Sequence, residues 1–155
     1  MIKIIRTRDP KAVQYMIPYF SMESEEDREI AGAQLANLMH TQPESVNVLQ
    51  AWNGDNGENL VSFIVGNVSN NPYVWIAQGW SKEGNPAQVA TEMFARIMLW
   101  AMALGKTAVR AETSRDLGAM YRRFGFDPVA TIVERRITPE EISTVLDRGR
   151  AVIDG

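Results

Sequence analysis

The sequence predicts a single mixed α/β domain, in which a central sheet is flanked by helices and followed by a C-terminal helix. Three consecutive stretches with strand patterns come directly before the longest helix pattern, as in an antiparallel meander. Another strand pattern follows that helix, and a strand–helix–strand unit implies a right-handed parallel crossover. A length of 155 residues and a hydrophobic share of 45% suit one globular domain.

The N-terminal part predicts one strand and two helices. Residues 2–5 form a short strand rich in β-branched residues. Asp9-Pro10 is typical of a helix start, and Pro18 stops or kinks that helix near its end. Ser24, with Asp27 three residues later, is a variant of the capping box that opens a second helix.

Three strand patterns follow in the middle of the chain, at residues 45–52, 59–68 and 73–80. The turn signals Asn53-Gly54 and Asn70-Asn71-Pro72 separate them. The second strand is continuously apolar at its centre, which is typical of a strand buried on both faces.

The longest helix pattern begins at Asn85 as N-cap, takes Pro86 as its first residue and ends before Gly105. A strand at 106–113 and a short helix at 115–124 follow. A last strand at 129–137 closes the expected core.

Residues 1–137 are thus expected to form the core, and residues 138–155 a helical extension. Thr138-Pro139-Glu140-Glu141 is a capping box that opens this last helix. Its apolar residues are expected to face inward: Ile142, Val145 and Leu146.

Composition excludes several classes of function. The chain has no cysteine, and with His40 as its sole histidine no metal site is expected. A net charge of −3 gives no global electrostatic reason to bind nucleic acid. No apolar run reaches the roughly 18 residues of a membrane span, and no signal-peptide pattern is present. We therefore expect a cytoplasmic protein.

The segment SRDLGAMYRRFGF, residues 114–126, is the most specific motif of the chain. It resembles the segment of the GCN5-related N-acetyltransferases (GNAT) in which an Asn after the fifth strand is followed seven residues later by Tyr and then by Gly-Phe. Here Ser114 stands at the Asn position, whereas Tyr121 and Gly125-Phe126 match. The element order of residues 1–137 agrees with the same family.

This resemblance implies the GNAT fold, acetyl-CoA as cosubstrate, and transfer of the acetyl group to an amine of a small molecule or protein. It implies that Tyr121 protonates the leaving thiolate and that Ser114 and Tyr121 contact the cofactor. The backbone of Gly79-Trp80-Ser81 would pair with the pantetheine arm. Glu112 is a candidate base through water, and His40 a second one. The alternatives are a solvated carboxylate, a helix-end histidine and a tyrosine that only packs its helix.

The pyrophosphate motif of this family is degenerate here. Family members carry Arg/Gln-x-x-Gly-x-Gly/Ala where the long helix begins, and ungapped counting places it on Asn85-Pro86-Ala87-Gln88-Val89-Ala90. Only Ala90 agrees. Pro86 would remove one N–H donor, and Gln88 adds a side chain where phosphate approaches, although its amide can itself donate. The resemblance implies a divergent cofactor site at Asn85, Ala87, Gln88, Val89 and Ala90.

Two functions are therefore compatible with the sequence. One is an acetyl-CoA-dependent N-acetyltransferase, whose acceptor region the acidic residues 23–29 would shape. The other is a catalytically inactive GNAT-fold binding or structural module. The degenerate motif and the additional helix also resemble GNAT-like proteins of bacteriophages, some of them virion or host-interacting components. A homodimer or another protein partner is compatible with both.

Overall fold

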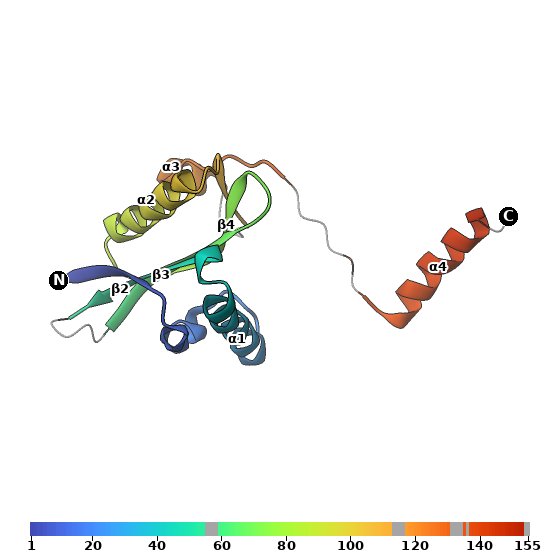
Figure 1. Cartoon of the computed structure of the whole chain (residues 1–155), viewed down its shortest axis with the longest axis horizontal. Coiled ribbons are helices and arrows are strands. Elements are labelled where there is room, and N and C mark those ends of the chain that lie inside the picture. The colour runs from blue at the N-terminus through green and yellow to red at the C-terminus, as the bar shows by residue number, and fades with distance from the viewer. Residues whose placement is uncertain (55–58, 113–116, 131–134, 136, 154–155) are drawn as a thin grey trace.

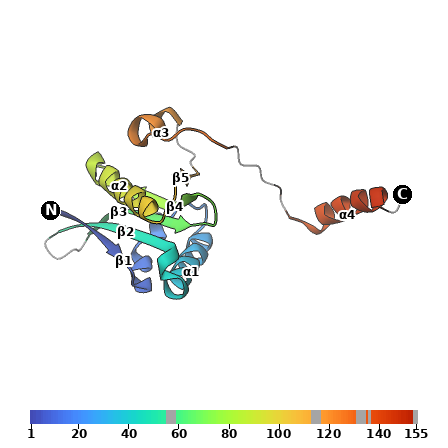
Figure 2. The ribbon, with the colours of Figure 1, turned by 45° about the horizontal axis from the view of Figure 1, so that its top comes forward.

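Five strands form one mixed sheet in the computed structural model (Figure 1). The structure describes residues 1–54, 59–112, 117–130, 135 and 137–153. The strands lie in the order β1 to β5 across the sheet (Figure 2), with bounds Ile2–Thr7, Val46–Asn53, Asn59–Val68, Tyr73–Ser81 and Ala108–Ala111. β1 to β4 pair antiparallel, whereas β4 and β5 pair in parallel. The predicted sheet class is confirmed.

Helices cover both faces of this sheet (Figure 1). One face carries α1 and the 3₁₀ turns η1 and η2, with bounds Glu25–Thr41, Pro10–Tyr15 and Ile17–Tyr19. The other face carries α2 (Ala87–Ala103), and α3 (Leu117–Phe124) lies on α2. A further 3₁₀ turn, η3 (Pro43–Ser45), leads from α1 into β2.

The hydrophobic core is divided by the sheet into two clusters. The cluster under α1 holds Val13, Met16, Phe20, Met39, Val46, Val48, Phe63 and Val65. The cluster under α2 holds Leu49, Ala51, Val61, Val89, Met93 and Ile97. Both clusters include residues of β3, so this strand is buried on both faces, as its continuously apolar sequence predicts.

The helix predicted after Asp9 is a pair of 3₁₀ turns instead of an α-helix. Asp9 caps the first turn as expected, and its side chain accepts a hydrogen bond of 3.0 Å from the N–H of Lys11. Pro18 lies in the first turn of η2, where a missing N–H is tolerated. Its ring would clash inside a continuous α-helix, which explains the division into two short turns.

The C-terminal helix α4 (Pro139–Ile153) begins as predicted, because Thr138 Oγ1 accepts a hydrogen bond of 3.2 Å from the N–H of Glu141. The prediction that its apolar residues face inward is wrong, because Ile142, Val145 and Leu146 are 48–49% exposed. Figure 1 shows α4 standing apart from the sheet. Helical periodicity identifies the apolar face of a helix, but it does not say whether the same chain covers that face.

The last predicted strand, 129–137, is only partly described. Residues 131–134 and 136 lie outside the described residues. The remaining positions of that range are not in a strand.

Candidate functional site

The second half of β4 has an open edge. β5 pairs with β4 only from Tyr73 to Ile76, and the last pair joins Ile76 to Ala111. Within the described part of the chain, the residues Gln78–Ser81 pair only with β3, and Ala77 before them pairs with neither neighbouring strand. We call residues 77–81 the open half of β4. Their remaining backbone N–H and C=O groups can pair with an extended ligand.

A β-bulge marks the point where β4 leaves β5. Val65 of β3 pairs with Gln78, whereas the next residue, Gly66, pairs with Ile76, so Ala77 is an additional residue in β4. A bulge bends its strand and increases the local twist. The open half of β4 therefore begins at a bend in the strand.

The open half of β4 leads through a short loop into the N-terminus of α2. Pro86 is the N-cap of this helix, so the prediction of Asn85 as N-cap and Pro86 as first helical residue is wrong. The side chain of Asn85 instead donates a hydrogen bond of 3.1 Å to Ser81 Oγ. Because Pro86 precedes the helix, its missing N–H removes no donor from the first turn, where Ala87 and Gln88 lie.

This helix terminus has the properties of an anion site. No side chain caps it, and its first turn contains no acidic residue. Free N–H groups and the helix dipole favour a negative charge at such a terminus. An open hollow of about 490 Å³ adjoins it, lined by Ala87, Gln88, Thr91, Glu92 and Ala95. The Glu92 carboxylate is paired with Arg96 at 3.2 Å, which offsets its charge.

The other implied cofactor residues surround the same region. Gly79, Trp80 and Ser81 lie in the open half of β4. A Cβ atom at Gly79 would meet nothing within 4 Å, so the space beside it is open. Val89 lies on the buried face of α2, and its N–H donates to the carbonyl of Pro86, which makes it an anchor of the helix start. Ala90 follows it in the same helix.

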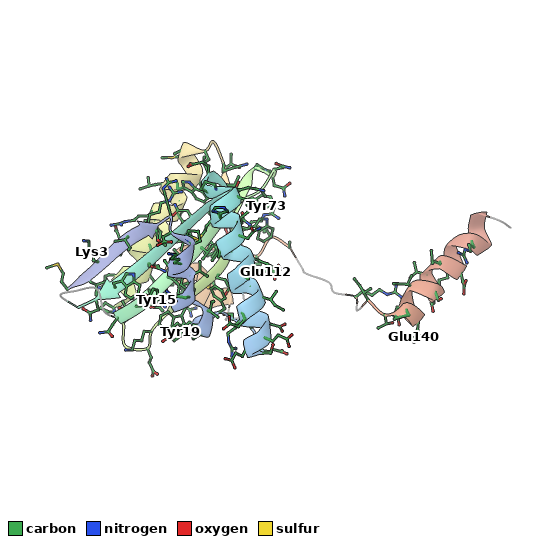
Figure 3. The ribbon with its side chains drawn as sticks, turned by 60° about the horizontal axis from the view of Figure 1, so that its bottom comes forward. Lys3, Tyr15, Tyr19, Tyr73, Glu112 and Glu140 are labelled. Atoms are coloured by element: carbon green, nitrogen blue, oxygen red, sulfur yellow. The ribbon has the colours of Figure 1, made fainter. Side chains whose placement is uncertain are left out.

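The structure describes the candidate catalytic residues in less detail than the cofactor residues. Glu112 directly follows β5, is exposed, and comes one residue after the last β4–β5 pair (Figure 3). Tyr121 lies in α3, and only the backbone position of this residue is described. Ser114 lies outside the described residues. His40 is exposed in the last turn of α1.

The Gly-Phe end of the motif at 114–126 has a packing role. Phe124 and Phe126 contact Phe94 of α2, with ring centroids 5.6 and 5.2 Å apart. Gly125 between them has a φ of +74°, a conformation that side chains rarely allow. This turn returns Phe126 to α2, so the motif holds α3 against α2.

Sequence reasoning missed one feature of the site, on the α1 face of the open half of β4. There Tyr19 of η2 stacks on Trp80, with centroids 3.9 Å apart and an angle of 13°. The N–H of Ser21 donates to Gln78 Oε1 at 3.2 Å. No local pattern signals this contact, because it joins residues about 60 positions apart.

Neither a metal site nor a membrane span is found among the described residues. No group of three or more His, Cys, Asp or Glu residues there could hold a metal ion. Among the described helices, none has the length and apolar character needed to cross a membrane.

Comparison with known proteins gives structural relatives only. No family model and no curated protein matches the sequence. Among the solved structures that resemble the chain are the following three. The aminoglycoside 6'-N-acetyltransferase AAC(6')-Ih from Acinetobacter baumannii has a TM-score of 0.67 at 12% identity, covering 89% of this chain and 99% of its own. A predicted acetyltransferase from Clostridium acetobutylicum, solved with acetyl-CoA, has a TM-score of 0.67 at 11% identity, covering 88% of this chain and 96% of its own. Glucosamine-6-phosphate N-acetyltransferase from Arabidopsis thaliana has a TM-score of 0.63 at 8% identity, covering 89% of this chain and 99% of its own.

The sheet topology and these neighbours define a mixed α/β fold with helices on both faces of the sheet. In particular, the chain has the GNAT fold that the motif at 114–126 and the element order predict.

Proposed function

We propose that this chain is an acetyl-CoA-dependent N-acetyltransferase that modifies an amine of a small molecule or protein. The observation that carries the proposal is the open half of β4, which leads directly to the uncapped N-terminus of α2. An extended pantetheine arm can pair with such an edge as an added strand. The pyrophosphate can bind the first-turn N–H groups of Ala87 and Gln88. One structural neighbour was solved with acetyl-CoA, which supports the same ligand here.

The proposed reaction joins an amine nitrogen to an acyl carbon, and acetyl-CoA supplies the activated acyl group. The neutral nitrogen forms a C–N bond, and the C–S bond of the thioester breaks. The nitrogen loses one proton and the sulfur gains one, so the products are an amide and the free thiol. Glu112 is the proposed acceptor of the first proton through water, and Tyr121 the proposed donor of the second.

The first test is thermal unfolding with and without acetyl-CoA. A ligand at about 100 times its dissociation constant adds roughly 2.7 kcal/mol of stability, which raises the Tm of a chain of this size by several degrees. The matched variants are Gln88→Glu and Gln88→Ala. We expect Gln88→Glu to abolish the shift, because it adds a negative charge in the first turn of α2, and Gln88→Ala to retain it.

Turnover can be followed with a thiol reagent, because the chain has no cysteine of its own to react. Release of CoA thiol that depends on an added amine would support the enzyme. Absence of any shift in the unmodified protein would overturn the proposal and favour an inactive binding module of the same fold.

A further inference from the structure

A short N-terminal segment overlies the open half of β4 on the α1 face. Two contacts hold it there: the hydrogen bond from the Ser21 N–H to Gln78 Oε1, and the stack of Tyr19 on Trp80. Both partners in β4 belong to its open half. A molecule that reaches this part of β4 from the α1 face therefore meets the Tyr19–Trp80 stack.

The Trp80 side of the stack packs on the core, and the Tyr19 side is exposed to solvent. Trp80 is partly buried and packs on Phe63, with centroids 5.7 Å apart, and Phe63 is 1% exposed. The carbonyl of Trp80 accepts a hydrogen bond of 2.8 Å from the buried hydroxyl of Ser62. Tyr19, by contrast, is 43% exposed. One face of its ring is covered by Trp80, so the exposed surface of a fixed aromatic ring borders the site.

The segment that carries Tyr19 is anchored to the sheet. Gln50 is 1% exposed, and its Nε2 donates a hydrogen bond of 3.1 Å to the carbonyl of Ala12 in η1. Its Oε1 accepts a hydrogen bond of 3.1 Å from Trp52. Because both polar ends of this buried amide are satisfied, the position of η1 and hence of η2 is well defined.

We infer that the Tyr19–Trp80 stack selects the acyl acceptor, and that the acceptor is a cationic amine that carries a planar aromatic ring. This inference rests on the proposed function, which places the acyl group along the open half of β4. A ring that stacks on Tyr19 is held by its apolar area and by the aromatic contact, worth about 0.5–1.5 kcal/mol beyond area alone.

The charge of the acceptor follows from the surroundings of the stack. The first turn of α1, six to eight residues after Tyr19, contains Glu25, Glu26 and Asp27. Because Ser21 is bonded to Gln78 and α1 begins four residues later, the first of these carboxylate residues lies within about 14 Å of Ser21. Carboxylates at this end of α1 favour an ammonium ion over an anionic compound. An amine approaches as the ammonium ion and loses its proton before it attacks.

The same segment contains a matched control. Tyr15 of η1 is 52% exposed and contacts Trp52 edge-on, with centroids 5.4 Å apart (Figure 3). Trp52 lies in β2, which β3 separates from β4, so this second pair lies away from the open half of β4. A change at Tyr15 therefore removes a similar exposed ring that does not border the open half of β4.

The test compares 2-phenylethylamine with 2-cyclohexylethylamine, which has the same reach and charge but no aromatic ring. We expect kcat/KM to favour the phenyl compound by about five- to tenfold in the unmodified protein, in Tyr19→Phe and in Tyr15→Leu. Tyr19→Leu should reduce the ratio to about one. An unchanged ratio in Tyr19→Leu, or a ratio of one in the unmodified protein, would overturn the inference.

Two further measurements separate this inference from the proposed function. The acetyl-CoA thermal shift of Tyr19→Leu should equal that of the unmodified protein, which shows that the variant is folded and binds the cosubstrate. If the unmodified protein gives no shift and no turnover, binding of 2-phenylethylamine is measured directly by ligand-observed NMR. Binding that Tyr19→Leu abolishes would then uphold ring recognition although the acetyltransferase proposal had failed. Absence of binding would overturn both.

Discussion

Gly32 in the middle of α1 tests how closely this helix is fitted to η2. An ideal Cβ atom at Gly32 would lie 2.6 Å from both Cδ1 and Cγ1 of Ile17 and 3.7 Å from Cγ1 of Val13. Carbon atoms in good contact are about 3.5–4.0 Å apart, so Ile17 would have to move by roughly 1 Å. Overpacking costs about 1–3 kcal/mol, whereas alanine in place of a helical glycine returns about 1 kcal/mol. We expect Gly32→Ala to be destabilising by about 1 kcal/mol.

Urea unfolding of a double-mutant cycle with Ile17→Ala measures this clash. Ile17→Ala alone should cost about 2–5 kcal/mol. In the Gly32→Ala background it should cost less, by about 1–3 kcal/mol, because the clash is already gone and the new methyl group fills part of the space. Ala33→Gly, at an exposed position of the same helix, measures the propensity contribution separately. A stabilising Gly32→Ala with no coupling to Ile17→Ala would refute the close approach.

Three other predictions concern the ends and edges of the fold. Gly105 has a φ of +76°, so Gly105→Ala should cost about 1 kcal/mol and lower the Tm by roughly 3 °C; an unchanged Tm would contradict this conformation. Ser62→Ala leaves the carbonyl of Trp80 without its 2.8 Å hydrogen bond and should lower the free energy of unfolding by about 1–3 kcal/mol in urea, whereas a neutral result would show that the carbonyl has another partner. Removal of residues 138–155 should leave the Tm of the remaining domain within about 2 °C, because the apolar face of α4 is exposed; a large decrease would show that α4 packs on the domain.

Most of the sheet could be predicted from the sequence because its signals are local. The strand at 59–68 has the bounds that its apolar run and the flanking turn residues indicate. The start of α1 is equally local, since Ser24 accepts a hydrogen bond of 3.0 Å from the N–H of Asp27, as the capping pattern predicts. Alternation, turn residues and caps act within a few positions of the chain, so one sequence is enough to read them.

The site depends on contacts that no short window contains. Asn is a residue type favoured at N-caps, but the side-chain amide of Asn85 donates a hydrogen bond to Ser81 instead, and the helix starts later. The open half of β4 is defined by where β5 stops pairing, which is a property of register. Tyr19 belongs to the site only because η2 folds back onto Trp80. Registers and folded-back segments are set by tertiary packing, which explains why these features were not predicted.

Because Ala77 is an additional residue in β4, each side chain after it points to the face of the sheet opposite to the one it would take in a regular strand. Ile76 pairs with Gly66, at which a Cβ atom would approach Trp100 of α2 to 3.0 Å, so this pair faces α2. Gln78 pairs with Val65 of the α1 core, although residues two apart in a regular strand share one face. Deleting Ala77 would remove the bulge but leave Ile76 paired with Gly66 and Gln78 with Val65, so Trp80 would still face the α1 side. A slip of one residue that paired Ala77 with Val65 would instead turn Trp80 toward α2 and present Gly79 on the α1 side, so the bulge decides which side chains the acceptor meets.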